Sequence, residues 1–60
     1  MTVYVNDTEV VILAGMTVRH ALIALGRLLE IEYGKRVYDE KGNEIGLGGA
    51  LTDGSKIYVR

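Results

Sequence analysis

The chain's single histidine, His20, is the first side chain to weigh as a catalytic or metal-binding group. Apolar spacing places it in the first turn of an expected helix, one residue off the apolar stripe. A histidine that activates a nucleophile needs that nucleophile within reach, and no cysteine or suitably spaced serine accompanies this one. We therefore expect His20 to be half-exposed and inert, and the chain to have no catalytic residue and no enzyme activity.

A cluster of acidic residues, "DEKGNE" at residues 39–44, raises the question of calcium binding. A loop of the EF-hand type needs oxygen ligands at alternating positions and a closing glutamate. Here Lys41 takes one ligand position, the glycine comes too early and the closing glutamate is missing. We expect a solvated hairpin turn that holds no metal ion, and no other motif in the chain indicates a cofactor.

The segment "GLGGAL" contains a diglycine, Gly48-Gly49, eleven residues before the last residue, Arg60. Phosphate-cradling and dinucleotide-binding glycine loops both require a helix directly after the glycines. A turn, "TDGS", and a strand-like segment follow here instead. We expect the two glycines to give a loop positive φ angles and to let it pass close to the sheet edge.

Composition limits the classes of function that remain. The 60 residues make one domain, residues 1–60, and without cysteine no disulfide supports its aliphatic core. The net charge of −1 argues against a nucleic-acid partner, because such proteins carry a strong basic excess. No apolar run approaches the roughly 18 residues of a membrane span and no leader pattern opens the chain, so we expect no membrane partner and a cytoplasmic location.

Apolar periodicity and turn residues predict several short strands and one helix. Residues 2–6 alternate as a strand and residues 9–14 are apolar on both faces, so the polar turn between them indicates an antiparallel hairpin. Thr17 is a suitable helix N-cap, and we expect Gly26 to end or distort the helix that follows. Further strands are expected around Val37, near residues 44–45 and at residues 56–60.

This order of elements predicts an α+β fold with a mixed sheet of four to five strands and one helix packed on one face. The first and last strands become parallel neighbours only if a long crossover joins them, and the helix supplies that crossover. Such an arrangement is the β-grasp, or ubiquitin-like, fold.

The residues also resemble that superfamily directly. "VYVNDTEVVILAGMTVRHALIALG" is similar to the N-terminal half of many β-grasp domains, and "GGALTDGSKIYV" is similar to their closing element. Sulfur carriers, TGS domains, SLBB domains and plant-type ferredoxins share this scheme. The likeness covers nearly the whole chain and implies the fold, whereas the superfamily hosts many functions.

Two departures from the family bear on function. Plant-type ferredoxins hold their cluster with four cysteines, and this chain has none. Sulfur carriers end in Gly-Gly, whereas here processing after Gly49 would remove a strand that we expect beside the first one. The missing cysteines exclude the ferredoxin role. Two alternative functions remain: a sulfur carrier acted on by an adenylating enzyme, and a small-ligand-binding module of the SLBB kind.

The feature that best indicates a function is one face of the expected sheet. If Val3 and Val5 face the helix, the tyrosines of the first and last strands lie on the opposite, uncovered face, with basic residues beside them. Aromatic and basic side chains on an open face are typical of protein interfaces, and ubiquitin-like domains commonly bind partners there. The candidate partner-binding residues are Tyr4, Tyr38, Lys56, Tyr58 and Arg60.

Other interpretations of this face remain open. Strand two must add one of its apolar pairs to it, either Val10 with Ile12 or Val11 with Leu13. The same face could pair two copies of the chain as a homodimer, and its tyrosines could stack nucleic-acid bases, although the net charge disfavours the latter. Alternatively, cross-strand tyrosines only stabilise the sheet. Our leading hypothesis is a non-catalytic module that binds a protein partner.

Overall fold

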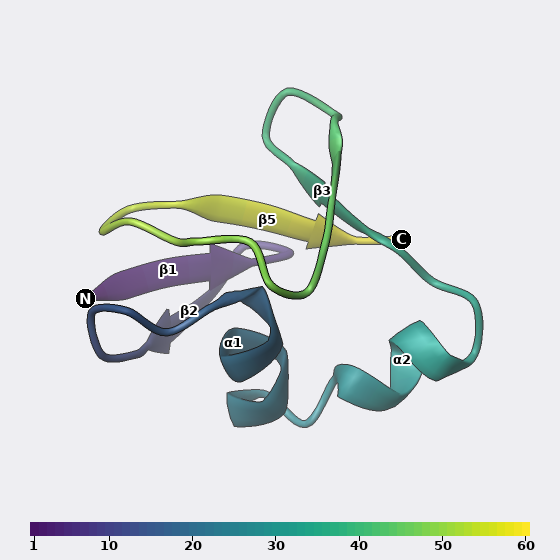
Figure 1. The fold of residues 1–60 in the computed structure, drawn as a ribbon, viewed down its shortest axis with the longest axis horizontal. Helices are drawn as coiled ribbons and strands as arrows, with labels where there is room; N and C mark the ends of the chain where they lie inside the picture. The colour runs from purple at the N-terminus through teal and green to yellow at the C-terminus, as the bar shows by residue number, and fades with distance from the viewer.

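The computed structural model describes all residues from Met1 to Arg60. It is an α+β structure in which a mixed five-stranded sheet carries two short helices on one side (Figure 1). In chain order the elements are β1 (Thr2–Val5), β2 (Thr8–Val11), α1 (Val18–Ala24), α2 (Leu28–Glu32), β3 (Val37–Asp39), β4 (Glu44–Ile45) and β5 (Lys56–Val59).

The strand order across the sheet is β2-β1-β5-β3-β4. β1 pairs with β2 in antiparallel orientation and with β5 in parallel orientation, while β3 is antiparallel to both β5 and β4. The predicted mixed sheet, and the predicted parallel contact between the first and last strands, are therefore confirmed. β5 lies at the centre of the sheet, and the crossover that returns to it includes both helices.

A two-residue turn joins β1 to β2 and sets the register of the hairpin. Asn6 and Asp7 have φ angles of 48° and 68°, the left-handed conformation that a type I′ turn requires. β2 is shorter than the predicted strand over residues 9–14. Ile12 still exchanges backbone hydrogen bonds with Met1, but the chain then turns, and the Met16 amide donates to the Leu13 carbonyl.

The core lies between the inner sheet face and α1. In α1, Val18, Ala21 and Leu22 are fully buried, as their 3.6-residue spacing predicts. Burying aliphatic surface supplies most of the stability of so small a domain. The remaining buried side chains come from the strands and loops, and they are Val3, Val5, Val10, Ile12, Val37, Leu51, Ile57 and Val59.

The prediction of a single helix is wrong, because the structure has two helices separated at Gly26. Gly26 has a φ of 69°, its amide donates to Ile23 and the Arg27 amide donates to Leu22, which is a Schellman ending. A new helix, α2, begins two residues later and packs Leu28 against the core. Neither helix has the length and apolar character that crossing a bilayer would demand.

The diglycine loop differs from its prediction in its backbone angles. Gly48 and Gly49 do not have positive φ angles, and their loop, which follows the edge strand β4, lies against the start of α1. The Val18 amide donates to the Gly49 carbonyl (3.1 Å), and the Arg19 amide donates to the Leu47 carbonyl (2.9 Å). The loop thus satisfies amides that a helix N-terminus leaves without partners.

Candidate functional site

The candidate residues lie together on the outer face, which we define as the sheet face opposite the helices. Tyr38 lies directly opposite Tyr58 in the β3–β5 register, and Tyr4 lies beside Lys56 in the β1–β5 register. Partners in register share a sheet face, and the residues that alternate with them are the buried valines and isoleucine of the core. The three tyrosines are half-buried, while the lysine is exposed.

Positive charge gathers at the end of β5. The Arg60 guanidinium lies 5.2 Å from the centre of the Tyr58 ring, which is a cation–π distance. Arg36 exchanges two backbone hydrogen bonds with Arg60 (2.7 and 2.9 Å), and its side chain pairs with Glu44 at 3.2 Å. Glu44 therefore neutralises Arg36, while Lys56 and Arg60 form no ion pair within the chain.

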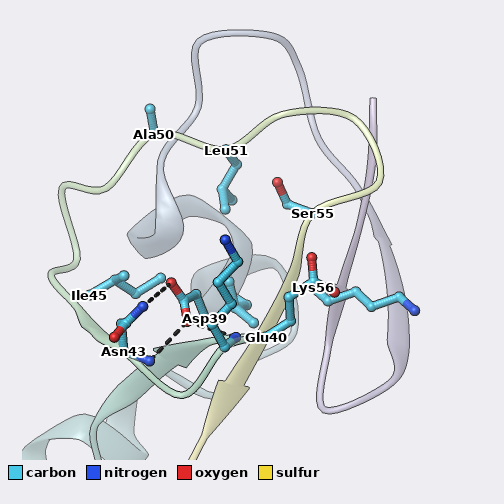
Figure 2. A pocket seen from close by; sticks show the side chains of 10 residues that line it. Asp39, Glu40, Asn43, Ile45, Ala50, Leu51, Ser55 and Lys56 are labelled. Atoms are coloured by element: carbon cyan, nitrogen blue, oxygen red, sulfur yellow. Dashed lines mark hydrogen bonds between the residues drawn. The ribbon is translucent and has the colours of Figure 1, made fainter.

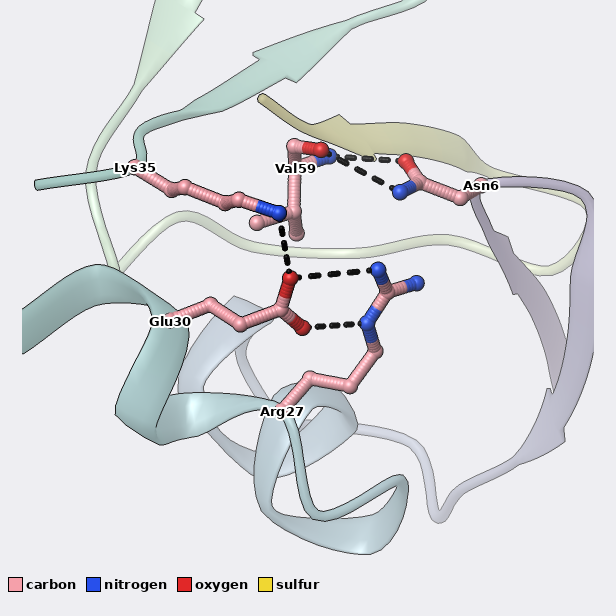
Figure 3. A network of polar contacts seen from close by, with 5 residues as sticks. All are labelled: Asn6, Arg27, Glu30, Lys35 and Val59. Carbon is pink, nitrogen blue, oxygen red and sulfur yellow. Dashed lines mark hydrogen bonds and ion pairs between the residues drawn. The ribbon is translucent and has the colours of Figure 1, made fainter. Parts of the chain in front are cut away.

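Asn6 holds β5 in the position that presents these residues. Its Nδ2 donates to the Val59 carbonyl (3.1 Å), and the Val59 amide donates to its Oδ1 (2.8 Å), as Figure 3 shows. The pair of bonds continues the β1–β5 contact past Val5, where the β1 backbone turns away. Sequence reasoning identified Asn6 only as a turn residue, because a contact across 53 positions leaves no local pattern.

A second apolar surface was not predicted as a site. It is a groove of about 320 Å³, called the edge groove below, between the end of β2 and α1. Val11 and Leu13 are 73% and 71% exposed beside it, and Ile23 is 52% exposed. Val11 and Leu13, rather than Val10 and Ile12, are thus the outward apolar pair of strand two. The groove is lined by Val11, Ile12, Leu13, Met16, His20, Ile23 and Ala24.

A polar hollow of about 380 Å³ lies between the β3–β4 turn and the segment that enters β5 (Figure 2). The Asp39 carboxylate lines it and accepts hydrogen bonds from the backbone amides of Asn43 and Lys41, both at 2.9 Å. These bonds, that of Asn43 foremost, lower the pKa of Asp39. Its oxygens hold together the hairpin turn that the sequence predicts, which gives this carboxylate a structural role.

Glu30 forms the most connected polar group of the helical side. Its carboxylate accepts hydrogen bonds from the Arg27 guanidinium and from Lys35 Nζ, the latter at 2.8 Å (Figure 3). The Arg27 bond, followed by the Lys35 bond, lowers the pKa of Glu30 to about 2. The three side chains connect the two ends of α2, so we assign them to the fold rather than to a site.

His20 is more exposed than predicted and has a structural role. It is the third residue of α1 and forms a capping box with Thr17, whose backbone amide donates to the His20 Nδ1 at 3.0 Å. No group of three or more histidine, aspartate or glutamate residues is arranged to hold a metal ion.

Comparison with known proteins found no match, whether to a protein family, to a curated protein or to a solved structure. The function of the outer face is therefore inferred from its own residues.

Proposed function

We propose that this chain is a β-grasp domain that works as a non-catalytic interaction module and binds a protein partner through the outer face. The β-grasp assignment is supported by the parallel β1–β5 pair with a helical crossover, and by the sequence resemblance. In this proposal Tyr4, Tyr38 and Tyr58 supply the contact area, and Lys56 and Arg60 supply the charge.

The observation that carries the proposal is the composition of an uncovered face. Three of the chain's four tyrosines lie on it, and both helices lie on the other side of the sheet. Tyrosine and arginine are the residues most enriched where proteins bind tightly, because they combine a large rigid surface with a polar group. The unpaired Lys56 and Arg60 favour a partner that presents carboxylates beside apolar side chains.

The test removes two of these rings and compares the result with a tyrosine elsewhere. Tyr4→Ser combined with Tyr58→Ser changes the outer face, whereas Tyr33→Ser changes a tyrosine that is 83% exposed at the end of α2. Each tagged variant is used to capture proteins from native lysate, and captured proteins are identified by mass. Circular dichroism verifies that the double variant retains its fold.

We expect a stoichiometric partner that binds the wild type and Tyr33→Ser but not the double variant. A partner that binds all three proteins equally would rule out the outer face as the binding surface. If the tyrosines only stabilise the sheet, the double variant would lose thermal stability without any change in what it captures.

The sulfur-carrier alternative makes a different prediction. Carrier chemistry at Gly49 requires cleavage after that residue, and cleavage there removes β5, which pairs with both β1 and β3. The intact mass of the protein from its native host separates the two functions. A species ending at Gly49 with a thiocarboxylate would support the carrier, whereas the uncleaved mass agrees with the interaction module.

A further inference from the structure

The β2 edge of the sheet has backbone groups without partners. In the β1–β2 register Val10 pairs with Val3 and Thr8 pairs with Val5. In a hairpin with a two-residue turn, the residue pair next to the turn is hydrogen-bonded, and so is every second pair beyond it. Thr8 and Val10 are therefore hydrogen-bonded to β1, and the backbone amides and carbonyls of Glu9 and Val11 point away from it. These groups are available to a further strand.

This edge has few of the features with which proteins usually prevent strand pairing. Such features are charged residues, above all lysine, or proline on the edge, a bulge, or a very short strand. β2 contains no lysine, the chain contains no proline, and Glu9 is the strand's one charged residue. Val11 and Leu13 are instead more than two-thirds exposed beside it. The opposite edge, β4, is only two residues long and contains Glu44.

We propose that a second copy of this chain pairs with β2 in antiparallel orientation, so that two five-stranded sheets become one across a two-fold axis. The same patch then serves both copies, as a two-fold dimer requires. The edge groove lies beside β2 in each copy, so the pairing also brings the two exposed Ile23 side chains toward the axis. This dimer does not require the partner-binding role of the tyrosines, although Glu9 and Val11 share the outer face with Tyr4.

The charge of Glu9 selects the register of the pair. A register centred on Glu9 would place two carboxylates directly opposite each other, which is destabilising. A register centred on Val11 places Val11 against its own copy and brings Leu13, which lies two residues past the end of β2, beside Glu9 of the second copy. The two Glu9 residues then lie four positions apart, about 13 Å along the strand. The second register covers both exposed aliphatic residues and separates the charges.

The first experiment measures association of the purified chain by sedimentation across a concentration series. An interface built on one short strand is small, so we expect a dimer with a Kd on the order of 10 µM. Val11→Lys introduces a lysine at an exposed edge position and is expected to raise the Kd at least tenfold. Leu29→Lys, at a residue 57% exposed on α2, is the matched control and leaves the Kd unchanged. A wild-type chain that stays monomeric up to about 1 mM overturns the proposal.

The second experiment tests the register without depending on a disruptive change. The chain has no cysteine, so Val11→Cys provides a single thiol at the proposed axis, where paired Cα atoms lie about 5.5 Å apart. A short bismaleimide cross-linker is expected to join Val11→Cys into dimers at least tenfold more efficiently than Tyr33→Cys. Equal cross-linking of the two variants overturns the register. In parallel, exchange of the Glu9 and Val11 amide hydrogens slows as concentration rises, and exchange that does not depend on concentration overturns the pairing.

Discussion

At the scale of single residues, His20 and Glu30 show that the groups best suited to chemistry are committed to holding helix ends. His20 accepts a hydrogen bond from the backbone amide of Thr17, and the Glu30 carboxylate accepts hydrogen bonds from both Arg27 and Lys35. A lone histidine and an acid with a strongly lowered pKa are both signals that often mark active sites. Here each signal has a structural cause, and both causes can be tested by substitution.

Replacing His20 tests its capping role. His20→Ala removes the acceptor of the Thr17 amide, so we expect the free energy of unfolding to fall by about 0.5–1 kcal/mol. His20→Glu restores an acceptor at the same position and adds a negative charge to a first turn that has none, so its stability equals or exceeds that of the wild type. Urea denaturation measures both variants. Equal losses for alanine and glutamate would contradict the role.

Glu30 makes stability depend on pH in the acid range. Its pKa is lowered from 4.5 to about 2 in the folded chain, so the carboxylate stabilises the fold above pH 4.5, and this contribution disappears as the pH falls through 2. Glu30→Gln removes the charge. We expect the melting temperature of the wild type to exceed that of the variant at pH 7, and the difference to shrink as the pH falls below 4.5 and to disappear below about pH 2. A difference that stays constant across this range would refute the assignment.

At the scale of elements, the diglycine loop and α1 form one unit. Gly49 lies so close to Gly46 that an added Cβ would be 3.1 Å from the Gly46 carbonyl oxygen and 3.5 Å from a Val18 methyl group. An added Cβ at Gly48 would meet nothing within 4 Å. The space around Gly49 therefore disfavours a side chain, whereas Gly48 has room for one.

Alanine at each glycine tests this difference. Gly48→Ala reduces the freedom of the unfolded chain without a clash, so stability is unchanged or rises by up to about 1 kcal/mol. Gly49→Ala presses a methyl group against the Gly46 carbonyl oxygen and must widen the turn between Gly46 and Gly49, so we expect it to be about 1 kcal/mol less stable than Gly48→Ala. Thermal unfolding of the two variants, which differ by one position, measures the gap. The reverse order of stability would show that the close contact is unimportant.

The elements that the sequence predicts correctly are those defined by neighbouring residues. Alternation along residues 2–6 and the short polar turn after them identified the β1–β2 hairpin, and the turn around Gly42 identified the β3–β4 hairpin. The second helix was missed because Gly26 ends α1 with a local motif, whereas α2 depends on packing Leu28 against a core assembled from distant strands. The edge groove was missed for the same reason, since it exists only where β2 and α1 meet.

At the scale of the whole molecule, stability depends on very few side chains. Only 11 of the 60 residues are buried, and a domain of this length is stable by about 3–9 kcal/mol. Leu22 of α1 is the largest fully buried side chain. The sequence predicted the residues of the outer face correctly because successive side chains of a strand point to opposite faces of the sheet, which separates Tyr4 and Tyr58 from the core.

A pair of adjacent substitutions tests this dependence on the core. Leu22→Ala leaves a cavity in the core and is expected to cost about 2–5 kcal/mol, which is enough to leave a large fraction of the chain unfolded. Ile23→Ala removes a similar side chain that is 52% exposed, and its cost should stay below about 1 kcal/mol. Chemical denaturation at low protein concentration, where the chain is monomeric, compares the two. Similar losses would mean that α1 is not packed as described.

The central position of β5 also has a consequence for how the protein is made. A ribosome releases Thr2–Val5 long before Lys56–Val59, yet β1 needs β5 as its parallel neighbour and β3 needs it on the other side. The early hairpin and α1 must therefore remain incompletely packed until β5 has emerged, with the core-facing Val3 and Val5 uncovered. The sheet can close only when the segment after Gly54 has emerged, so we expect this chain to acquire its fold in one late step rather than progressively from its N-terminus.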